Sequence, residues 1–200
     1  MGNDSHLREA LIARSELLKG HFLQVVRDTV RLPSGQHATR EFVRHPGAVM
    51  VIGLLDDGQV ILERQYRHPM GAVMIEFPAG KLDAGEGSLK CAQRELLEET
   101  GYSATEWAYA GQLAPTIAYS DERLDIWFAR GLTLGERRLD EGEFLDVITA
   151  SPEALQAWCR QGDVIDAKTL VGALWLQNVL SGAWSLDWSG ATPEAKLDSP

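Results

Sequence analysis

GKLDAGEGSLKCAQRELLEETGY, residues 80–102, is the stretch on which the interpretation of the whole chain depends. Glu95, Glu98 and Glu99 stand at i, i+3 and i+4, so a helix would place all three on one face. Carboxylates packed that closely repel one another unless a cation lies between them. Carboxylate oxygens suit Mg²⁺ or Mn²⁺, whereas the softer His and Cys ligands that Zn²⁺ prefers form no cluster in the sequence. The spacing therefore predicts a helix with a divalent metal ion at its acidic face.

The flanks of this stretch predict a loop, a helix and a second loop. Leu89, Ala92 and Leu96 recur at helical spacing, which gives the helix an apolar side that can pack on a core. Gly85 belongs to the loop before the helix, and Gly101 stands where a C-terminal glycine ends a helix. An acidic run taken alone more often marks a solvated helix face, so the metal interpretation depends on the complete pattern.

The complete pattern resembles the signature of the Nudix hydrolase family. Five residues separate Gly80 from Glu86, and seven more lead to R-E-L-L-E-E-T-G-Y at residues 94–102. The resemblance implies an α/β fold, a Nudix-type α/β/α sandwich with a mixed β-sheet, and metal-dependent hydrolysis of a nucleoside diphosphate linked to another group. It implies metal ligands at the carbonyl of Ala79 and at Glu95, Glu98 and Glu99, with supporting roles for Gly80, Glu86, Arg94 and Gly101.

Length and composition limit the class of protein. Two hundred residues with 44% hydrophobic content suit one domain with an appendage. No apolar run approaches the ~20 residues that span a bilayer, and the N-terminus lacks the pattern of a signal peptide, so we expect a cytoplasmic protein without membrane attachment. Cys91 and Cys159 are too few for a disulfide framework. A formal net charge of −10 argues against a nucleic acid as partner.

Two parts are expected along the chain, an N-terminal subdomain over residues 1–45 and a hydrolase domain over residues 46–200. Leucine and isoleucine at helix-like spacing predict a helix over residues 7–18. Alternating residues on either side of a P-S-G-Q turn predict a β-hairpin over residues 22–32 and 38–44. Because a hairpin alone is marginal in water, this one either adds an edge to the main sheet or forms a dimerisation subdomain.

The expected hydrolase domain contains both strands and helices. Residues 47–55 and 60–66 are apolar strands joined by D-D-G-Q, which predicts a hairpin between them. Ser151 before Pro152 indicates the start of a helix. The remaining predicted elements are strands over residues 106–113, 124–129 and 145–149, and helices over residues 152–161 and 166–180.

Residues on both sides of the signature are expected to contact substrate. Arg67 directly follows the predicted strand over residues 60–66, where its planar guanidinium suits bidentate binding of a diphosphate. The E-F-P-A-G-K run at residues 76–81 resembles Nudix enzymes that act on ADP-ribose and sugar nucleotides. Pro115 stands at the offset of a marker proline in the ADP-ribose pyrophosphatase branch. The expected substrate-binding residues are Arg67, Glu76, Arg40, Pro115 and Tyr119.

An acidic, glycine-containing loop over residues 139–144 precedes the last predicted strand. A general base must reach the attacking water without being held as a metal ligand, and a mobile loop can deliver a carboxylate. Glu141 and Glu143 are the candidates, with Glu98 as the third residue of the expected catalytic set. The resemblance to ADP-ribose pyrophosphatases, which have their base in a similar D-E-x-E loop, favours Glu141.

The resemblance therefore predicts a Mg²⁺-dependent enzyme, with Mn²⁺ as an alternative metal, that hydrolyses ADP-ribose to AMP and ribose 5-phosphate. Hydrolysis of GDP-mannose or a dinucleoside polyphosphate stays open, because no motif identifies the residue that stacks on the base. A Nudix module that senses ADP-ribose without catalysis is a third reading, which the intact set of acids disfavours. Such relatives are commonly homodimers in which the N-terminal hairpin completes the substrate site, so a homodimer is expected.

Overall fold

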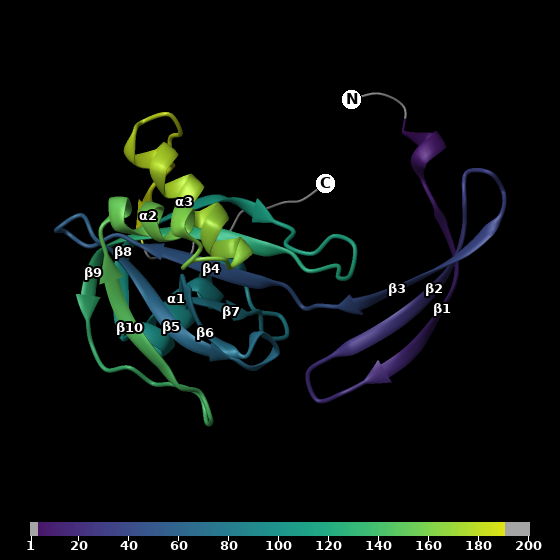
Figure 1. Cartoon of the computed structure of the whole chain (residues 1–200), viewed down its shortest axis with the longest axis horizontal. Coiled ribbons are helices and arrows are strands. Elements are labelled where there is room, and N and C mark those ends of the chain that lie inside the picture. Colours follow the sequence, from purple (N-terminus) through teal and green to yellow (C-terminus); the bar gives the residue numbers. More distant parts are fainter. Residues whose placement is uncertain (1–3, 191–200) are drawn as a thin grey trace. The chain divides into compact units, whose positions relative to one another are not determined.

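The structure is a computed structural model that describes residues 4–190, and it divides into two compact units (Figure 1). The N-terminal unit ends at Pro46 and also takes in the separate segment Ala114–Arg123. The sandwich unit comprises Gly47–Leu113 and the chain from Leu124 onward. The polypeptide therefore passes from one unit to the other three times.

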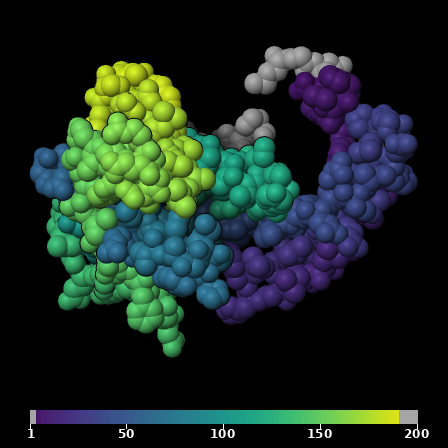
Figure 2. All heavy atoms as spheres, in the orientation of Figure 1, coloured from purple at the N-terminus to yellow at the C-terminus, as the bar shows by residue number. Residues whose placement is uncertain are grey.

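The N-terminal unit contains an antiparallel sheet in the order of its strands β1 (Ala10–Lys19), β2 (Gln24–Arg31) and β3 (His37–Arg44), preceded by a 3₁₀ turn, η1 (Ser5–Leu7). The predicted hairpin is present as β2 and β3, which pair along their whole length without a bulge. In Figure 2 the purple and blue atoms of these strands form a single thin layer.

The prediction of a helix over residues 7–18 is wrong, because most of this stretch is strand β1. The register of β1 against β2 is interrupted twice, so that Ile12 and Leu17 have no directly opposed partner. A bulge adds a residue to one strand and shifts the alternation of its side chains. The apolar residues of β1 therefore recur at spacings that resemble those of a helix, although its backbone pairs along a sheet.

The segment Ala114–Arg123 joins the N-terminal unit through the end of β3. Val43 N donates to Tyr119 O at 2.8 Å. Arg44 forms an ion pair with Asp121 at 2.6 Å. A connection between two strands of the sandwich unit is thus part of the N-terminal unit.

Two β-sheets make up the sandwich unit, with strands β4 (Ala48–Gly53), β5 (Val60–Arg67), β6 (Ala72–Glu76), β7 (Ala79–Lys81), β8 (Tyr102–Leu113), β9 (Leu124–Leu134), β10 (Leu145–Ala150) and β11 (Ser189–Gly190). The larger sheet has the order β11-β8-β9-β4-β7. It is mixed, because β4 runs parallel to β9 while the other neighbours are antiparallel. The smaller sheet is antiparallel and has the order β10-β5-β6.

The predicted strands over residues 47–55 and 60–66 are present as β4 and β5, but the predicted hairpin pairing between them is wrong. The D-D-G-Q stretch does form a tight reversal, in which Leu55 N donates to Gln59 O at 2.9 Å. Beyond a single Leu54–Val60 bridge, however, the strands enter different sheets. All six residues of β4 are buried, so this strand is covered on both faces and has a neighbour on each edge, β9 and β7.

The helices of this unit are α1 (Ser88–Thr100), α2 (Pro152–Gln161) and α3 (Ala167–Leu180), and a 3₁₀ turn, η2 (His68–Met70), follows β5. Their ends agree with the predicted signals. Gly101 ends α1 at a φ of 78°, and the Ser151 side chain accepts from Ala154 N at the start of α2. Such caps satisfy backbone groups that a helix end leaves unpaired. No helix among residues 4–190 is long and apolar enough to cross a membrane.

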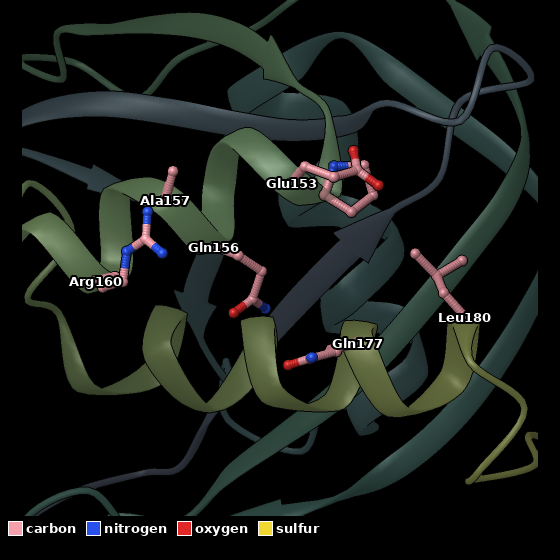
Figure 3. Close-up of a pocket in the computed structure, with 7 residues that line it drawn as sticks. Glu153, Gln156, Ala157, Arg160, Gln177 and Leu180 are labelled. Carbon is pink, nitrogen blue, oxygen red and sulfur yellow. The ribbon is translucent and has the colours of Figure 1, made fainter.

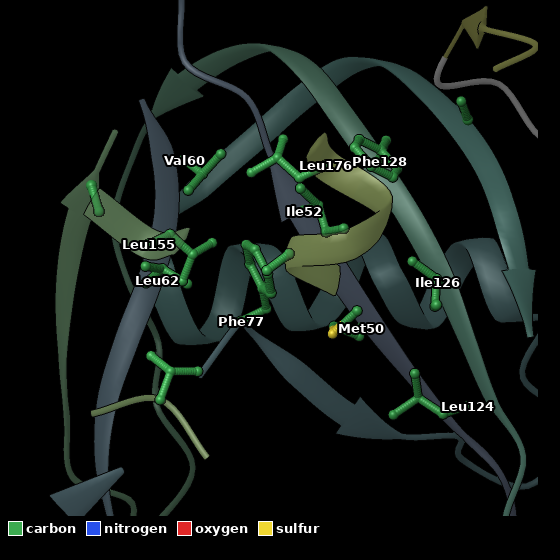
Figure 4. Packing of buried hydrophobic residues seen from close by; sticks show 14 of the residues in the cluster. Met50, Ile52, Val60, Leu62, Phe77, Leu124, Ile126, Phe128, Leu155 and Leu176 are labelled. Atoms are coloured by element: carbon green, nitrogen blue, oxygen red, sulfur yellow. The ribbon is translucent and has the colours of Figure 1, made fainter. Parts of the chain in front are cut away.

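Side chains alternate along β4, so its two faces belong to two hydrophobic clusters. Val49 and Val51 pack with α1 in one cluster. Met50 and Ile52 pack with α2 and α3 in the other. This larger cluster includes Met50, Ile52, Leu62, Phe77, Phe128, Leu155 and Leu176 (Figure 4). Helices therefore cover both faces of a mixed sheet, which confirms the predicted α/β/α sandwich.

Candidate active site

Arg94 lies at the centre of the acidic residues of α1 and of the loop before it. Its Nε and Nη2 atoms donate to the two carboxylate oxygens of Glu86 at 3.0 and 2.8 Å. Its Nη1 atom donates to Glu95 Oε1 at 2.8 Å and to Glu98 Oε2 at 3.0 Å. The guanidinium lowers the pKa of Glu86 to about 2, so this carboxylate is ionised at neutral pH. The positively charged Arg94 guanidinium therefore lies between three of the predicted site residues, Glu86, Glu95 and Glu98.

Gly80 in β7 leaves the space in which Glu95 packs. A Cβ atom built on Gly80 would lie 1.8 Å from the Cδ atom of Glu95, far inside any real contact distance. The Glu95 side chain is 12% exposed, and burial raises its pKa. Gly80 is not among the glycines with positive φ. This glycine is therefore required because a carboxylate approaches the backbone closely, and not because of its φ angle.

Glu99 lies against β7, the strand just before the α1 loop. Ala79 N donates to Glu99 Oε2 at 3.0 Å, and Glu99 is buried. Burial, followed by the nearby carboxylates of Glu63, Glu95 and Glu143, raises the pKa of Glu99 to about 10. A bound cation would favour the ionised form of this carboxylate, because opposite charge offsets both burial and repulsion.

The donor chemistry of these residues fits a divalent metal ion. Glu95 and Glu98 each use one carboxylate oxygen to accept from Arg94, and Glu99 uses one to accept from a backbone amide. Carboxylate and carbonyl oxygens are the ligands of hard cations such as Mg²⁺ and Mn²⁺. Within residues 4–190, no three acidic, His or Cys side chains are already gathered closely enough to hold an ion. The predicted ligands thus have the right chemistry in an arrangement organised by Arg94.

The loop before β10 brings one of its two candidate bases to these acids. Gln65 Nε2 donates to Glu143 Oε1 at 3.2 Å, which ties the loop to β5. After burial, the charge of Glu143 is among the causes that raise the pKa of Glu95 and of Glu99. Glu141 lies exposed in the turn of the same loop. The structure therefore places Glu143 beside the acidic residues and Glu141 in solvent.

Arg67 and Glu76 form a bidentate ion pair between β5 and β6. Arg67 Nε donates to Glu76 Oε1 at 2.7 Å, and Nη2 donates to Glu76 Oε2 at 2.9 Å. Lys168, in the first turn of α3, also pairs with Glu76 and donates to Asp166 Oδ2 at 3.0 Å. In this structure, therefore, a buried carboxylate holds the guanidinium fork that was expected to bind a diphosphate.

The other three predicted substrate-binding residues belong to the N-terminal unit. Arg40 in β3 forms an ion pair with Glu9. Pro115 and Tyr119 lie in the turn within Ala114–Arg123, where Tyr119 is 73% exposed. These residues are thus presented by the unit that does not contain α1.

Sequence reasoning missed Glu63, Gln65 and Lys168, which lie beside the predicted site residues. Glu63, Gln65 and Arg67 alternate along β5, so all three side chains are on one face of the strand. Glu63 is directly opposite Glu76 in β6. Polar residues at alternating positions after the apolar V-I-L were the signal that could have identified Glu63 and Gln65 as neighbours of Arg67. Lys168 carried no such signal, because only the docking of α3 brings it to Glu76.

A separate hollow of about 480 Å³ lies between α2 and α3 (Figure 3). Its lining contains Glu153 and Arg160 as charged residues, with Gln156 and Gln177 as polar neighbours. None of the predicted site residues takes part in the lining. This hollow is therefore distinct from the acidic cluster of α1.

Comparison with known proteins decides the family. A family model described as a NUDIX domain matches residues 44–170, which include the whole of the signature and β4 to β10. The chain belongs to the Nudix family. Nudix hydrolases generally need a divalent metal ion, and the oxygen donors of this Nudix protein agree with that requirement.

Similarity to known proteins extends over most of this Nudix protein. It is 36% identical over 173 residues to the ADP-ribose pyrophosphatase of Bacillus subtilis, an alignment that covers 86% of this chain and 94% of the relative. It is 35% identical over 171 residues to the methanol dehydrogenase activator of Bacillus methanolicus, with 84% and 92% covered. The ADP-ribose pyrophosphatase of Mycobacterium tuberculosis is 34% identical over 174 residues, with 86% and 84% covered. The crystal structure of an ADP compounds hydrolase gives a TM-score of 0.80 at 22% identity, covering 88% of this chain and 97% of that chain, which supports the fold.

Proposed function

We propose that this Nudix protein hydrolyses the pyrophosphate bond of ADP-ribose to AMP and ribose 5-phosphate, with Mg²⁺ as its metal and Mn²⁺ as an alternative. The observation that carries the proposal is Arg94, whose guanidinium organises Glu86, Glu95 and Glu98 next to Gly80. The names of the relatives, among them two ADP-ribose pyrophosphatases, support the choice of substrate.

The acids of α1 and a backbone carbonyl of β7 would bind the metal and thereby position the reacting phosphorus. Glu95, Glu98, Glu99 and the carbonyl of Ala79 are the proposed ligands. When bound, the metal ion polarises phosphoryl oxygens and lowers the pKa of a bound water. The chain also has to supply a base for the proton of the attacking water. We assign that role to Glu141, which the turn leaves exposed.

Glu143 is the second candidate for the base. Its hydrogen bond with Gln65 fixes it beside the proposed ligands, whereas a base delivered on substrate binding has to move. We therefore propose that Glu141→Gln lowers kcat by a larger factor than it changes KM. Glu143→Gln is proposed to lower kcat and also to weaken metal binding.

Arg67 is proposed to bind the diphosphate. A substrate oxygen would meet its Nη1 atom or replace Glu76 as partner of Nε and Nη2. Exchange of partners at Arg67 is feasible because Glu76 keeps Lys168, so the buried carboxylate would still have a cation.

A homodimer in the cytoplasm is the proposed working form. Several side chains of the N-terminal unit are apolar and 43 to 58% exposed, and a second copy would cover them: Leu11, Ile12, Leu17, Leu18 and Phe22. Arg40, Pro115 and Tyr119 of the same unit would then contribute to substrate binding. Free thiols at Cys91 and Cys159 suit a reducing compartment.

The test is to incubate the protein with ADP-ribose, GDP-mannose, NADH and diadenosine polyphosphates, with Mg²⁺, Mn²⁺ or EDTA, in ¹⁸O-labelled water. AMP and ribose 5-phosphate should form fastest from ADP-ribose with Mg²⁺, and EDTA should stop the reaction. Glu98→Gln should lose most of the turnover while remaining folded. The matched control is Glu106→Gln, because the native Glu106 pairs with Arg130 on the outside of β8 and β9.

Each outcome of this test selects one function. Faster turnover of another substrate keeps the chemistry and replaces ADP-ribose. Binding of ADP-ribose without turnover identifies a sensor. Normal turnover in a folded Glu98→Gln variant contradicts the assignment of Glu98 as a metal ligand.

A further inference from the structure

Glu63 is a buried acid that the proposed reaction leaves unexplained. It is 0% exposed, and within residues 4–190 neither of its carboxylate oxygens has a hydrogen-bond partner. An ionised carboxylate buried without partners costs several kcal/mol, and a protonated one still needs an acceptor for its O–H. A group of this kind in a native protein calls for a missing partner.

The surroundings of Glu63 show where that partner would bind. Its position in β5 places Glu63 on the face that also presents Gln65 and Arg67, directly opposite Glu76. After burial, Glu63 is the largest cause of the raised pKa of Glu99. After burial, Glu76 and Glu143 raise the pKa of Glu63, whereas Lys168 and Arg67 lower it, so carboxylates and cations both lie near this residue.

The nearby cations of the protein are engaged elsewhere. Arg67 donates from Nε and Nη2 to Glu76, and Lys168 bonds to Glu76 and Asp166. Arg94 is occupied by the acids on the other side of the cluster. Arg67 and Lys168 thus form their hydrogen bonds with Glu76, and neither donates to the Glu63 carboxylate.

We propose that Glu63 is a further metal ligand, which binds a divalent cation jointly with Glu99 and Glu143. The inference rests on the proposed metal-dependent function and extends its ligand set beyond the signature, onto β5. A hard divalent cation is the partner that fits, because the buried atoms without a hydrogen-bond partner among residues 4–190 are oxygens, the two of the Glu63 carboxylate and Oε1 of Gln65. Binding of the cation would supply the partner that both oxygens of Glu63 lack.

Titration with Mn²⁺ tests this assignment without reference to turnover. Free Mn²⁺ is measured by electron paramagnetic resonance for wild type, Glu63→Gln and the surface control Glu106→Gln. Glu63→Gln is expected to lose one class of bound Mn²⁺ or to bind it at least about tenfold more weakly, while Glu106→Gln matches wild type. Superimposed curves for Glu63→Gln and wild type would overturn the proposal. Wild type that binds no Mn²⁺ would instead refute the metal-dependent function itself.

Thermal unfolding of the same proteins gives a second, independent readout. Because glutamine keeps the volume of glutamate and replaces a carboxyl group that has no hydrogen-bond partner, Glu63→Gln should melt in EDTA no lower than wild type. Mn²⁺ should raise its Tm by less than it raises that of wild type. A variant that melts lower than wild type in EDTA, or fails to fold, would show that the protein alone stabilises this carboxylate, and the metal assignment would be wrong.

Discussion

At Gly80 the site depends on the absence of a side chain. Gly80→Ala would put a methyl group in the space of the Glu95 carboxylate, so the glutamate must move. We expect Mn²⁺ affinity and ADP-ribose turnover to fall at least about tenfold. Gly87→Ala is the matched control, because its Cβ meets nothing within 4 Å and its φ of −79° suits alanine. Wild-type affinity in a folded Gly80→Ala variant would contradict this role.

Local spacing is what made the acids of α1 predictable. Glu95, Glu98 and Glu99 share a helix face whatever the rest of the fold does, and the signature also covers Gly80 and Glu86. Glu63 and Lys168 reach the same region through sheet register and the docking of α3. Such proximity depends on contacts distant in sequence, so no spacing rule could have revealed it.

The β1–β2 pair depends on one well-oriented ion pair, which makes its stability sensitive to acid. Arg14 Nε and Nη2 donate to Asp28 Oδ1 and Oδ2 at 2.6 and 2.7 Å, and the Asp28 side chain is 10% exposed. The hydrogen bonds from Arg14 lower the pKa of Asp28. Folding thus favours the ionised form, so this contribution is complete above the unfolded-state pKa of about 3.9 and disappears as the pH falls through the lower folded-state value.

Asp28→Asn is therefore expected to lower the Tm at pH 7, by a margin that narrows below about pH 4. Thermal unfolding followed by circular dichroism at several pH values measures that margin. Glu41→Gln is the control, because the Arg27–Glu41 pair is about half exposed and such pairs contribute little. A gap between Asp28→Asn and wild type that stays constant down to pH 3 would contradict the assignment.

Elements with strong local sequence signals were predicted correctly, whereas features that depend on pairing with a strand distant in the sequence were not. Ser151 and Pro152 determine the start of α2 by capping and by a fixed φ, and both act within one turn. The bulges of β1 arise only against β2, so the isolated sequence of residues 7–18 resembles a helix. The separation of β4 from β5 likewise follows from the neighbours that each strand finds in its own sheet.

For the whole molecule, the exposed apolar side chains of β1 predict self-association. Wild type should sediment as a dimer at micromolar concentration. Leu18→Glu should shift it toward monomer, because a charge cannot be buried in an apolar interface without a partner. Leu134→Glu makes the same change at an exposed leucine of β9 and should leave the dimer intact. Monomeric wild type would remove the dimer from the proposed function.

The segment Ala114–Arg123 restricts how this protein can be recombined with its relatives. The N-terminal unit is built from two pieces of chain, joined by the Val43–Tyr119 hydrogen bond and the Arg44–Asp121 ion pair. A chimera made with one crossover near Pro46 would combine a β3 from one parent with the matching segment from another. Chimeras that take both pieces of the N-terminal unit from the same parent preserve those contacts. We therefore expect such chimeras to fold better than those that take only one of the two pieces.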